Sequence, residues 1–418
     1  MKVTIDPGPL QGTIAAIPSK SAAHRLLILA AMADGPTEIE LAANPGQDIE
    51  RTIDCLRAVG AAISRSGGSV RVIPPPRPVP SPQLHCGESG STLRFMLPVA
   101  AALCGGGRFS GSGRLPERPL GELAAALKKQ GLTFSGGRLP FTAAGRLKPG
   151  DYLLPGNISS QYITGLLLAL PALPGDSTIR LRGPLESAAY VELTLAALRR
   201  FKIEVRSCGD RFEIPGGQRY RSPGRMAVEG DWSNAAFFLA AGALGGKVSI
   251  EGLDLSSPQG DRAIVPLLAR FGALAGISGS RVTVSAGALR GGEIDLRQIP
   301  DLLPVLAAAA ASAAGTTSFH GAARLRLKES DRIASTAAMV NALGGDAVEL
   351  PEGLLVRGEK LSGGVVDSCG DHRIAMAAAV AAIRAVKPVT ILDAAAVEKS
   401  YPSFFADYLK LGGRVDGF

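Results

Sequence analysis

The sequence contains few cysteines and histidines, and neither set has the spacing of a disulfide framework or a metal site. The cysteines are Cys55, Cys86, Cys104, Cys208 and Cys369, an odd number without any C-x-x-C pair. The histidines are His24, His85, His320 and His372, and none has the spacing of metal ligands. We therefore expect reduced thiols and no bound metal.

Long apolar runs and basic tracts are also missing. No apolar run approaches the roughly 18–20 residues that cross a bilayer, and residues 1–6 lack the apolar core of a secretory signal. We therefore expect a cytoplasmic protein with no membrane partner. Basic residues never occur more than two together, and aromatic residues are only 5% of the chain, which argues against nucleic acid as a partner. The net charge of +8 still favours anionic partners.

The 418 residues are long enough for two or more domains, and 46% of them are hydrophobic, which is enough for a substantial core. Hydrophilic residues recur before stretches rich in alanine and leucine. The markers of this recurrence are Lys20, Gly90, Ser160, Trp232, Asp301 and Asp371, at intervals of 70, 70, 72, 69 and 70 residues. The helices predicted after these markers cover residues 25–33, 93–103, 162–173, 235–244, 302–314 and 374–383. The period therefore predicts six repeats of about seventy residues.

A second helix, amphipathic in pattern, recurs in the same phase. Its predicted ends lie near Gly60, Gly131, Lys202, Gly272, Gly344 and Gly412. Residues 69–73 and 281–284 alternate with period two and are rich in β-branched residues, which predicts strands. Each repeat should therefore contain two helices and several short strands.

The first helix of each repeat is apolar almost all round, so we expect buried helices with sheets outside. The N-terminus of a helix offers unpaired N–H groups and a positive dipole, which together favour anions. For any single helix, simple capping by Ser or Asp would explain the polar start. The basic residues near these starts suit phosphate and carboxylate recognition. They are Lys20, Arg25, Arg94, Arg118, Lys328, Arg332, Arg373 and Lys399.

Eight motifs in order along the chain resemble those of the 5-enolpyruvylshikimate-3-phosphate synthase family. They occupy residues 19–25, 90–94, 117–120, 159–161, 299–301, 328–332, 371–373 and 398–400. The resemblance implies a two-domain, inside-out α/β barrel built from six repeats. Domain one would comprise residues 1–18 plus 229–418 and carry the general base and a carboxylate clamp. Domain two would comprise residues 19–228 and hold a substrate phosphate, with the active site in the cleft between the domains.

The resemblance further implies that the enolpyruvyl group of phosphoenolpyruvate is transferred to the 5-hydroxyl of shikimate 3-phosphate. Phosphate would be released by addition and elimination through a tetrahedral intermediate, in the pathway to chorismate and the aromatic amino acids. No metal and no organic cofactor would be needed. We expect a monomer whose partners are these two small molecules, and we expect glyphosate to compete with phosphoenolpyruvate.

The family's functional residues carry over to matching positions. Those implied to contact shikimate 3-phosphate are Lys20, Ser21, Arg25, Ser159, Ser160, Gln161, Ser187, Tyr190, Asp301 and Lys328. Those implied to contact phosphoenolpyruvate are Lys20, Gly90, Arg118, Gln161, Arg332, Arg373 and Lys399. Asp301 would accept the proton of the 5-hydroxyl, Glu329 would serve proton transfer at the methylene carbon, and Lys20 would be the third catalytic residue.

Simpler roles stay open for two of these residues. Asp301 also suits a cap for the helix predicted to begin at residue 302, and Glu329 also suits an ion pair with Arg332. Two positions depart from the family pattern. Glu88 stands where many relatives have asparagine, and Arg324 stands near the position of another asparagine.

Two other functions fit the sequence less well. UDP-N-acetylglucosamine enolpyruvyl transferases share the fold and the donor, but they carry Lys-Asn in the first motif and commonly a reactive cysteine on a loop. This chain has Lys20 followed by Ser21, and it has no cysteine near residues 114–119. A non-enzymatic scaffold that binds anions or nucleic acid would gain nothing from Asp301 and Glu329 in its cleft.

Overall fold

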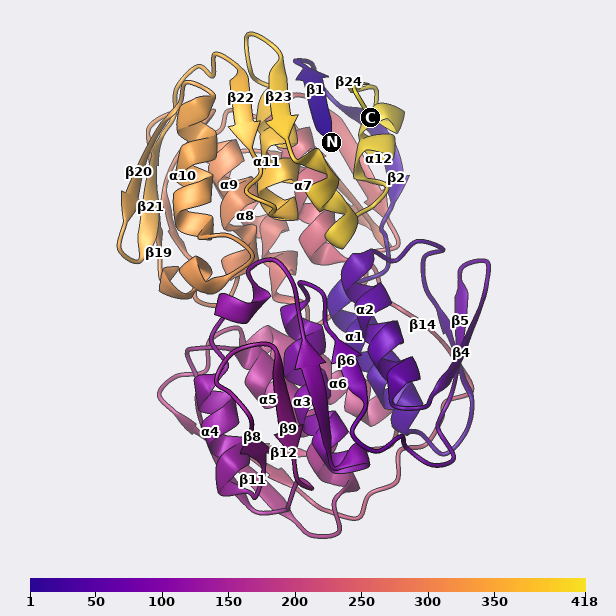
Figure 1. The fold of residues 1–418 in the computed structure, drawn as a ribbon. Coiled ribbons are helices and arrows are strands. Elements are labelled where there is room, and N and C mark those ends of the chain that lie inside the picture. The colour runs from indigo at the N-terminus through magenta and orange to yellow at the C-terminus, as the bar shows by residue number, and fades with distance from the viewer. The chain divides into compact units, whose positions relative to one another are not determined.

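The structure is a computed structural model that describes residues 1–418, and in it the chain forms two compact units. Unit 1 consists of Met1–Ser19 and Glu229–Phe418, and unit 2 consists of Lys20–Val228. Each unit has its own hydrophobic core. None of the helices combines the length and the apolar composition needed to cross a membrane. Figure 1 shows the elements of both units along the chain.

Six four-stranded sheets, three in each unit, share one pattern: a parallel pair at one edge is followed by two antiparallel pairs. In unit 2 the sheets are β14(Arg225–Ala227)-β3(Thr37–Glu40)-β5(Ser69–Ile73)-β4(Ala62–Ser66), β6(Gln83–His85)-β7(Gly106–Ser110)-β9(Phe141–Ala144)-β8(Thr133–Phe134) and β10(Asp151–Pro155)-β11(Ser177–Arg182)-β13(Arg211–Ile214)-β12(Arg206–Cys208). In unit 1 they are β2(Gln11–Ala15)-β15(Lys247–Glu251)-β17(Arg281–Ser285)-β16(Leu274–Ser278), β18(Glu293–Asp295)-β19(Thr316–His320)-β21(Gly353–Arg357)-β20(Asp346–Leu350) and β22(Gly364–Asp367)-β23(Val389–Leu392)-β1(Lys2–Asp6)-β24(Arg414–Asp416). The strands predicted at 69–73 and 281–284 are confirmed as β5 and β17.

The helices are of two kinds. Those buried on nearly all sides are α1(Lys20–Met32), α3(Gly90–Cys104), α5(Ser160–Ala169), α7(Trp232–Gly245), α9(Leu303–Ala310) and α11(His372–Ala382). Those that bury one side are α2(Gln47–Ala58), α4(Gly121–Lys129), α6(Ala188–Arg200), α8(Ile264–Phe271), α10(Arg332–Ala342) and α12(Phe404–Lys410). Short 3-10 helices are η1(Leu115–Glu117), η2(Leu170–Ala172), η3(Gly260–Ala263), η4(Pro300–Leu302), η5(Ala323–Leu327) and η6(Ala394–Lys399).

The buried helices form the centre of each unit. In unit 1, α7, α9 and α11 pack against one another, and in unit 2, α5 packs against both α1 and α3. Sheet strands pack on these helices from outside, as β15 does on α7 and β7 does on α3 (Figure 1). Their side chains alternate between buried and more exposed, which is expected where one sheet face covers a core and the other meets water.

The predicted helix starts at residues 25, 93 and 235 are too late. The helices begin at Lys20, Gly90 and Trp232 because their polar residues form the first turn instead of preceding it. Ser89 caps α3 by accepting from the Thr92 amide at 3.2 Å, and Asp231 caps α7 by accepting from the Asn234 amide at 2.8 Å.

The predicted helices 162–173 and 302–314 are too long. The helix predicted at 162–173 ends at Ala169, and the chain continues as the 3-10 helix η2. This segment contains Pro171, and proline cannot donate the next helical hydrogen bond. The helix predicted at 302–314 is divided into the 3-10 helix η4 and the α-helix α9. Helix α9 stops at Ala310, before Gly315 turns the chain with φ of 85°.

Candidate anion site

Arg332, the first residue of α10, is the centre of a buried charge cluster in unit 1. Its side chain is only 2% exposed, and it donates to three carboxylates: Nε to Asp371 at 2.8 Å, Nη1 to Asp301 at 2.7 Å and Nη2 to Glu329 at 2.6 Å. Burial alone would lower the pKa of Arg332, but the charges of Asp371, Glu329 and Asp301 raise it above its ordinary value. The guanidinium is therefore a permanent cation whose donors already bind protein carboxylates.

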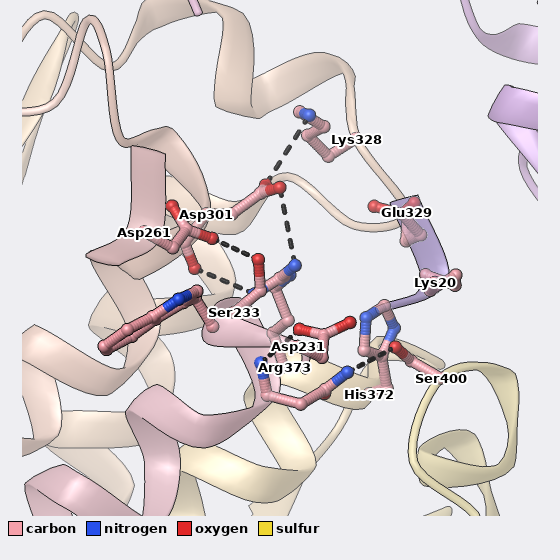
Figure 2. Close-up of polar contacts among 12 residues, drawn as sticks. Lys20, Asp231, Ser233, Asp261, Asp301, Lys328, Glu329, His372, Arg373 and Ser400 are labelled. Carbon is pink, nitrogen blue, oxygen red and sulfur yellow. Dashed lines mark hydrogen bonds and ion pairs between the residues drawn. The ribbon is translucent and has the colours of Figure 1, made fainter. Parts of the chain in front are cut away.

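Asp301 lies in η4 and faces three cations. Besides Arg332, its carboxylate lies 3.6 Å from Lys328 Nζ and 3.4 Å from Arg373 Nη2. Asp301 lies inside η4, and Ile299 and Leu302 occupy the N-cap positions of η4 and α9, so Asp301 is not the N-cap residue of either helix. Figure 2 shows Lys328 reaching toward this carboxylate.

Lys328 has an unusual environment for a lysine. Desolvation by burial lowers the pKa of Lys328 to about 8, and the negative charge of Asp301 only partly opposes the shift. The residue therefore titrates close to neutral pH. Next to it in the chain, Glu329 forms the ion pair with Arg332 that the sequence left open as an alternative role.

The start of α11 completes this cluster. Asp371 is fully buried and caps α11 by accepting from the Arg373 amide at 2.9 Å. Lys399 Nζ donates to the Gly370 carbonyl at 2.6 Å, and Arg373 Nη1 donates to the Asp301 carbonyl at 3.2 Å. Unit 1 therefore brings together six predicted residues. They are Asp301, Lys328, Glu329, Arg332, Arg373 and Lys399.

Sequence reasoning missed two residues of this cluster. Asp261, in η3, is buried and accepts a hydrogen bond from the Ser233 hydroxyl of α7. Burial raises the pKa of Asp261 to about 6, the negative charge of Asp301 adds to the shift, and Arg373 opposes it. No local signal marks either residue, since an isolated aspartate and an isolated serine are ordinary near helix starts.

In unit 2, Lys20 is the first residue of α1. Its Nζ lies 2.8 Å from Asp48 Oδ2, in the first turn of α2, so an acidic partner already holds the ammonium. Ser21 follows in the same helical turn. The sequence motif gave no role to Asp48.

Arg25, one turn further along α1, is buried among α5 and α6. It donates from Nε to Thr194 Oγ1 at 2.8 Å, and from Nη2 to Thr164 Oγ1 at 3.3 Å and to the Tyr190 carbonyl at 2.9 Å. Ser187 precedes α6 with a positive φ of 53°, which is uncommon for a residue with a side chain. Arg25 therefore fixes the segment that carries Ser187 and Tyr190.

A second group in unit 2 surrounds the start of α3. Gln161 accepts from Arg94 Nη1 at 3.1 Å and donates to Ser91 Oγ at 2.9 Å. A β-carbon built on Gly90 would lie 2.8 Å from Arg118 Nη1 and closer still to Arg94, so these guanidinium groups occupy the space beside the glycine. Gly90 and Gln161 therefore lie together with two cations, Arg94 and Arg118, at the N-terminus of α3.

The remaining predicted residues lie at element starts. Ser159 caps α5 by accepting from the Gln161 amide at 3.3 Å, and Ser160 is the first residue of that helix. The Glu88 carboxyl group lies against Gly113, in the loop after β7. Arg324 donates from Nη2 to the Arg297 carbonyl.

The fold defines the class of protein to which this chain belongs. It matches an EPSP synthase from Acinetobacter baumannii with a TM-score of 0.82 and 26% identity over 99% of both chains. The enolpyruvyl transferase NikO from Streptomyces tendae matches with a TM-score of 0.80 and 19% identity, over 99% of this chain and 98% of that one, which is a likeness of fold. The class is therefore that of the enolpyruvyl transferase fold.

The sequence narrows the class to one family. The family model of EPSP synthase (3-phosphoshikimate 1-carboxyvinyltransferase) matches residues 5–408, so the chain belongs to this family. The 3-phosphoshikimate 1-carboxyvinyltransferase of Clostridium kluyveri is 41% identical over 99% of this chain and 98% of that protein. The protein of the same name from Clostridium acetobutylicum is also 41% identical, with the same coverage. The resemblance found in the eight motifs is confirmed.

Proposed function

We propose that the protein transfers the enolpyruvyl group of phosphoenolpyruvate to the 5-hydroxyl of shikimate 3-phosphate and releases phosphate. Membership of the EPSP synthase family over nearly the whole chain supports this activity. The observation that carries it is the position of Asp301, a carboxylate faced by Lys328, Arg332 and Arg373. A base next to several cations suits a reaction in which a hydroxyl loses its proton beside anionic substrates.

The proposed chemistry is an addition followed by an elimination. Protonation of the methylene carbon of phosphoenolpyruvate makes the neighbouring carbon electrophilic, and the 5-hydroxyl attacks it as Asp301 accepts the hydroxyl proton. A tetrahedral intermediate forms and collapses when phosphate leaves and the methyl group gives its proton back. Glu329 serves the proton transfer at this carbon, and Lys20 is the third catalytic residue.

Phosphoenolpyruvate would be held by several cations of the chain. Arg373 at the start of α11 suits its carboxylate, and Lys399 at the end of η6 and Arg118 beside Gly90 suit its phosphate. Arg332 would join the clamp by exchanging one of its carboxylate partners for that of the substrate. Glu329 is the most exposed of the three partners and is therefore the one released, which would free it for proton transfer.

Shikimate 3-phosphate would be bound mainly by unit 2. The proposed contacts are Lys20, Ser21, Arg25, Ser159, Ser160, Gln161, Ser187, Tyr190, Asp301 and Lys328. The hydroxyl and amide donors of Ser159, Ser160 and Gln161 at the start of α5 support a phosphate site there, because a helix N-terminus favours an anion. Unit 1 would act as the domain of the base and the carboxylate clamp, and unit 2 as the domain of the substrate phosphate.

We also propose that the six sheets mark six repeats in an inside-out α/β barrel architecture. The common order of one parallel pair and two antiparallel pairs in every sheet supports this, as does the alternation of buried and amphipathic helices. The proposed contacts all come from one chain, which is compatible with a monomer.

A phosphate-release assay tests the function. Release should require both shikimate 3-phosphate and phosphoenolpyruvate and should be unaffected by EDTA. No release with the two substrates, or equal release when UDP-N-acetylglucosamine replaces shikimate 3-phosphate, would contradict the proposal. Omitting each substrate in turn is the control for background hydrolysis of phosphoenolpyruvate.

A further inference from the structure

A continuous chain of buried polar side chains links α1, α2 and α3 in unit 2. His24 Nδ1 lies 2.7 Å from Thr52 Oγ1, which lies 2.7 Å from Thr92 Oγ1, and Thr92 Oγ1 lies 2.8 Å from Ser89 Oγ. All four residues are almost fully buried. None of the eight sequence motifs gave a function to this hydrogen-bond chain.

The chemistry of the four groups sets the direction of these hydrogen bonds. Ser89 accepts from the Thr92 amide as the cap of α3, and the Asp48 carbonyl, 3.4 Å from Thr92 Oγ1, can only accept. Thr92 therefore gives its single hydroxyl proton to Ser89 or to that carbonyl, and it accepts from Thr52. The Thr52 proton is then used, so His24 must donate from Nδ1.

This order requires a proton on Nδ1, and a neutral imidazole in the Nδ1–H tautomer supplies it. His24 Nε2 is buried and has no hydrogen-bond partner, which suits the unprotonated nitrogen of that tautomer. Burial lowers the pKa of His24 well below its ordinary value, and the charges of Lys20 and Arg25 lower it further. The ring also packs edge-on against Phe95 of α3, with centroids 6.2 Å apart, which restricts its orientation.

The hydrogen-bond chain reaches residues to which the proposed function gives substrates. Ser89 immediately precedes Gly90, where α3 begins beside Arg118. The Asp48 carbonyl accepts from Thr92, and the Asp48 carboxylate binds Lys20. The chain therefore ties together the starts of α1, α2 and α3.

We propose that His24 is a positioning residue for phosphoenolpyruvate, which it serves by donating from Nδ1 into the Thr52–Thr92–Ser89 chain and so holding Lys20 and the start of α3 in place. This inference rests on the proposed function. Without the imidazole donor, Thr52 is free to turn its proton elsewhere and Thr92 loses its fixed direction. The cap at Ser89 and the Asp48 contact then lose their common anchor.

Nitrogen NMR of the whole protein labelled with ¹⁵N-histidine tests the proton order without any substrate. The signal of His24 is assigned by its loss in His24→Gln. We expect a proton on Nδ1, a bare Nε2 and no titration in the pH range in which an ordinary histidine titrates. A proton on Nε2, or an imidazolium within that range, would overturn the proposal even if the enzyme is active.

Steady-state kinetics test the positioning role. In His24→Leu the KM for phosphoenolpyruvate should rise about tenfold or more, with a smaller change in kcat, since the chemistry keeps its base and acid. His24→Asn keeps an N–H close to the position of Nδ1 and should restore the KM to within about threefold. His85→Leu replaces an exposed histidine of β6 outside the chain and is the matched control, with unchanged kinetics.

Thr92→Val breaks the same hydrogen-bond chain between Thr52 and Ser89. If the chain acts as a unit, the double variant His24→Leu/Thr92→Val should raise the KM no more than the larger single change does. Fully additive effects, or an unchanged KM in a folded His24→Leu, would refute the positioning role. A wild type inactive toward both substrates would refute the proposed function instead, and the NMR result on the tautomer would still stand.

Discussion

At the scale of the residue, the cluster around Arg332 shows that a buried cation can be shared among competing acids. Three carboxylates meet one guanidinium that is almost fully buried. Removing the cation would leave buried carboxylates unpaired, which is costly, whereas exchanging one carboxylate for another keeps the charges balanced. This favours a site in which substrate carboxylate and protein carboxylate exchange on the same arginine.

The proposed base gives the most direct kinetic prediction. Asp301→Asn keeps the shape of the side chain but cannot accept the hydroxyl proton, so kcat should fall about 100-fold or more. Binding of shikimate 3-phosphate, measured by calorimetry, should change much less than kcat. Asp295→Asn, which alters an exposed aspartate paired with Arg297, is the control. A near-normal kcat in Asp301→Asn would remove Asp301 from the chemistry.

Lys328 should determine how the KM for shikimate 3-phosphate changes with pH on the alkaline side. Burial lowers its pKa to about 8, so the ammonium is present below that pH and is lost as the pH rises through it. The KM for shikimate 3-phosphate should therefore rise above about pH 8. Lys328→Arg keeps the charge at all these pH values and should flatten this rise, and a rise that stays the same in the variant would assign it to another group.

Asp261 should make stability depend on pH in the opposite sense to an ordinary ion-paired aspartate. Its pKa of about 6 in the folded protein lies above the ordinary value of 3.8, so the folded state binds more protons than the unfolded state between these values. The free energy of unfolding therefore falls as the pH rises from 4 to above 6.

Asp261→Asn removes this titration and keeps an acceptor for Ser233. Relative to the wild type, the variant should gain about 1–3 kcal/mol in unfolding free energy between pH 4 and pH 7.5. Denaturant unfolding at the two pH values measures the gain. An equal difference between the two proteins at both pH values would contradict a raised pKa for Asp261.

At the scale of the element, every amphipathic helix is followed by a residue with a positive backbone φ. The chain adopts a positive φ at Gly60, Gly131, Gly272, Gly344 and Gly412 after five of them. After α6 the same position is Lys202, with φ of 60°. A β-carbon is strained in this left-handed region, whereas glycine is not.

Lys202→Gly should therefore stabilise unit 2, by about 1 kcal/mol, because the strain of the left-handed residue is removed. Lys202→Ala is the matched control: it also removes the exposed lysine side chain but keeps the β-carbon, so it should leave the stability nearly unchanged. Chemical denaturation of the three proteins measures both effects. A gain for alanine equal to that for glycine would show that the lysine side chain, and not the backbone, carries the cost.

The helix starts explain how far sequence could predict these elements. Hydrophobic periodicity located every buried helix, but Ser89 and Asp231 look like loop residues although the helix includes the turn that follows them. The residues that follow the amphipathic helices were predictable because five of the six are glycine. Breaks inside apolar runs, such as the one at Pro171, depend on a single residue.

The site shows the same division between local and distant signals. Motif residues such as Lys328 and Arg332 were found because they are neighbours in sequence and recur in a known family. Ser233 and Asp261 are 28 residues apart, and so are His24 and Thr52, so their pairing exists only in the folded chain. Buried polar chains of this kind have no periodicity that sequence reasoning can detect.

At the scale of the whole molecule, the two units differ in how the chain builds them. Unit 2 is one continuous segment, Lys20–Val228, whereas unit 1 needs the N-terminal segment as well as Glu229–Phe418. Strand β1 lies inside its sheet, between β23 and β24, and β2 pairs with β15. Unit 1 therefore depends on residues that are distant in sequence from the rest of its core.

This difference predicts that the N-terminal strand controls the stability of unit 1 alone. Val3 and Ile5 of β1 are fully buried, while Lys2 and Asp6 at its ends are exposed. Val3→Ala/Ile5→Ala should destabilise unit 1 by about 3–6 kcal/mol, since each truncation removes buried methyl groups and leaves a cavity. Lys2→Ala/Asp6→Ala alters the same strand without touching the core and should have little effect.

Limited proteolysis during heating, read by mass spectrometry, separates the two units. In the core variant, cleavage within residues 229–418 should begin at a lower temperature than in the wild type, while a fragment close to residues 20–228 persists because its core is complete in itself. In the exposed-residue variant, both units should lose protection at the wild-type temperature. Simultaneous loss of both units in the core variant would show that they unfold as a single cooperative body, and the independence of the two cores would then be wrong.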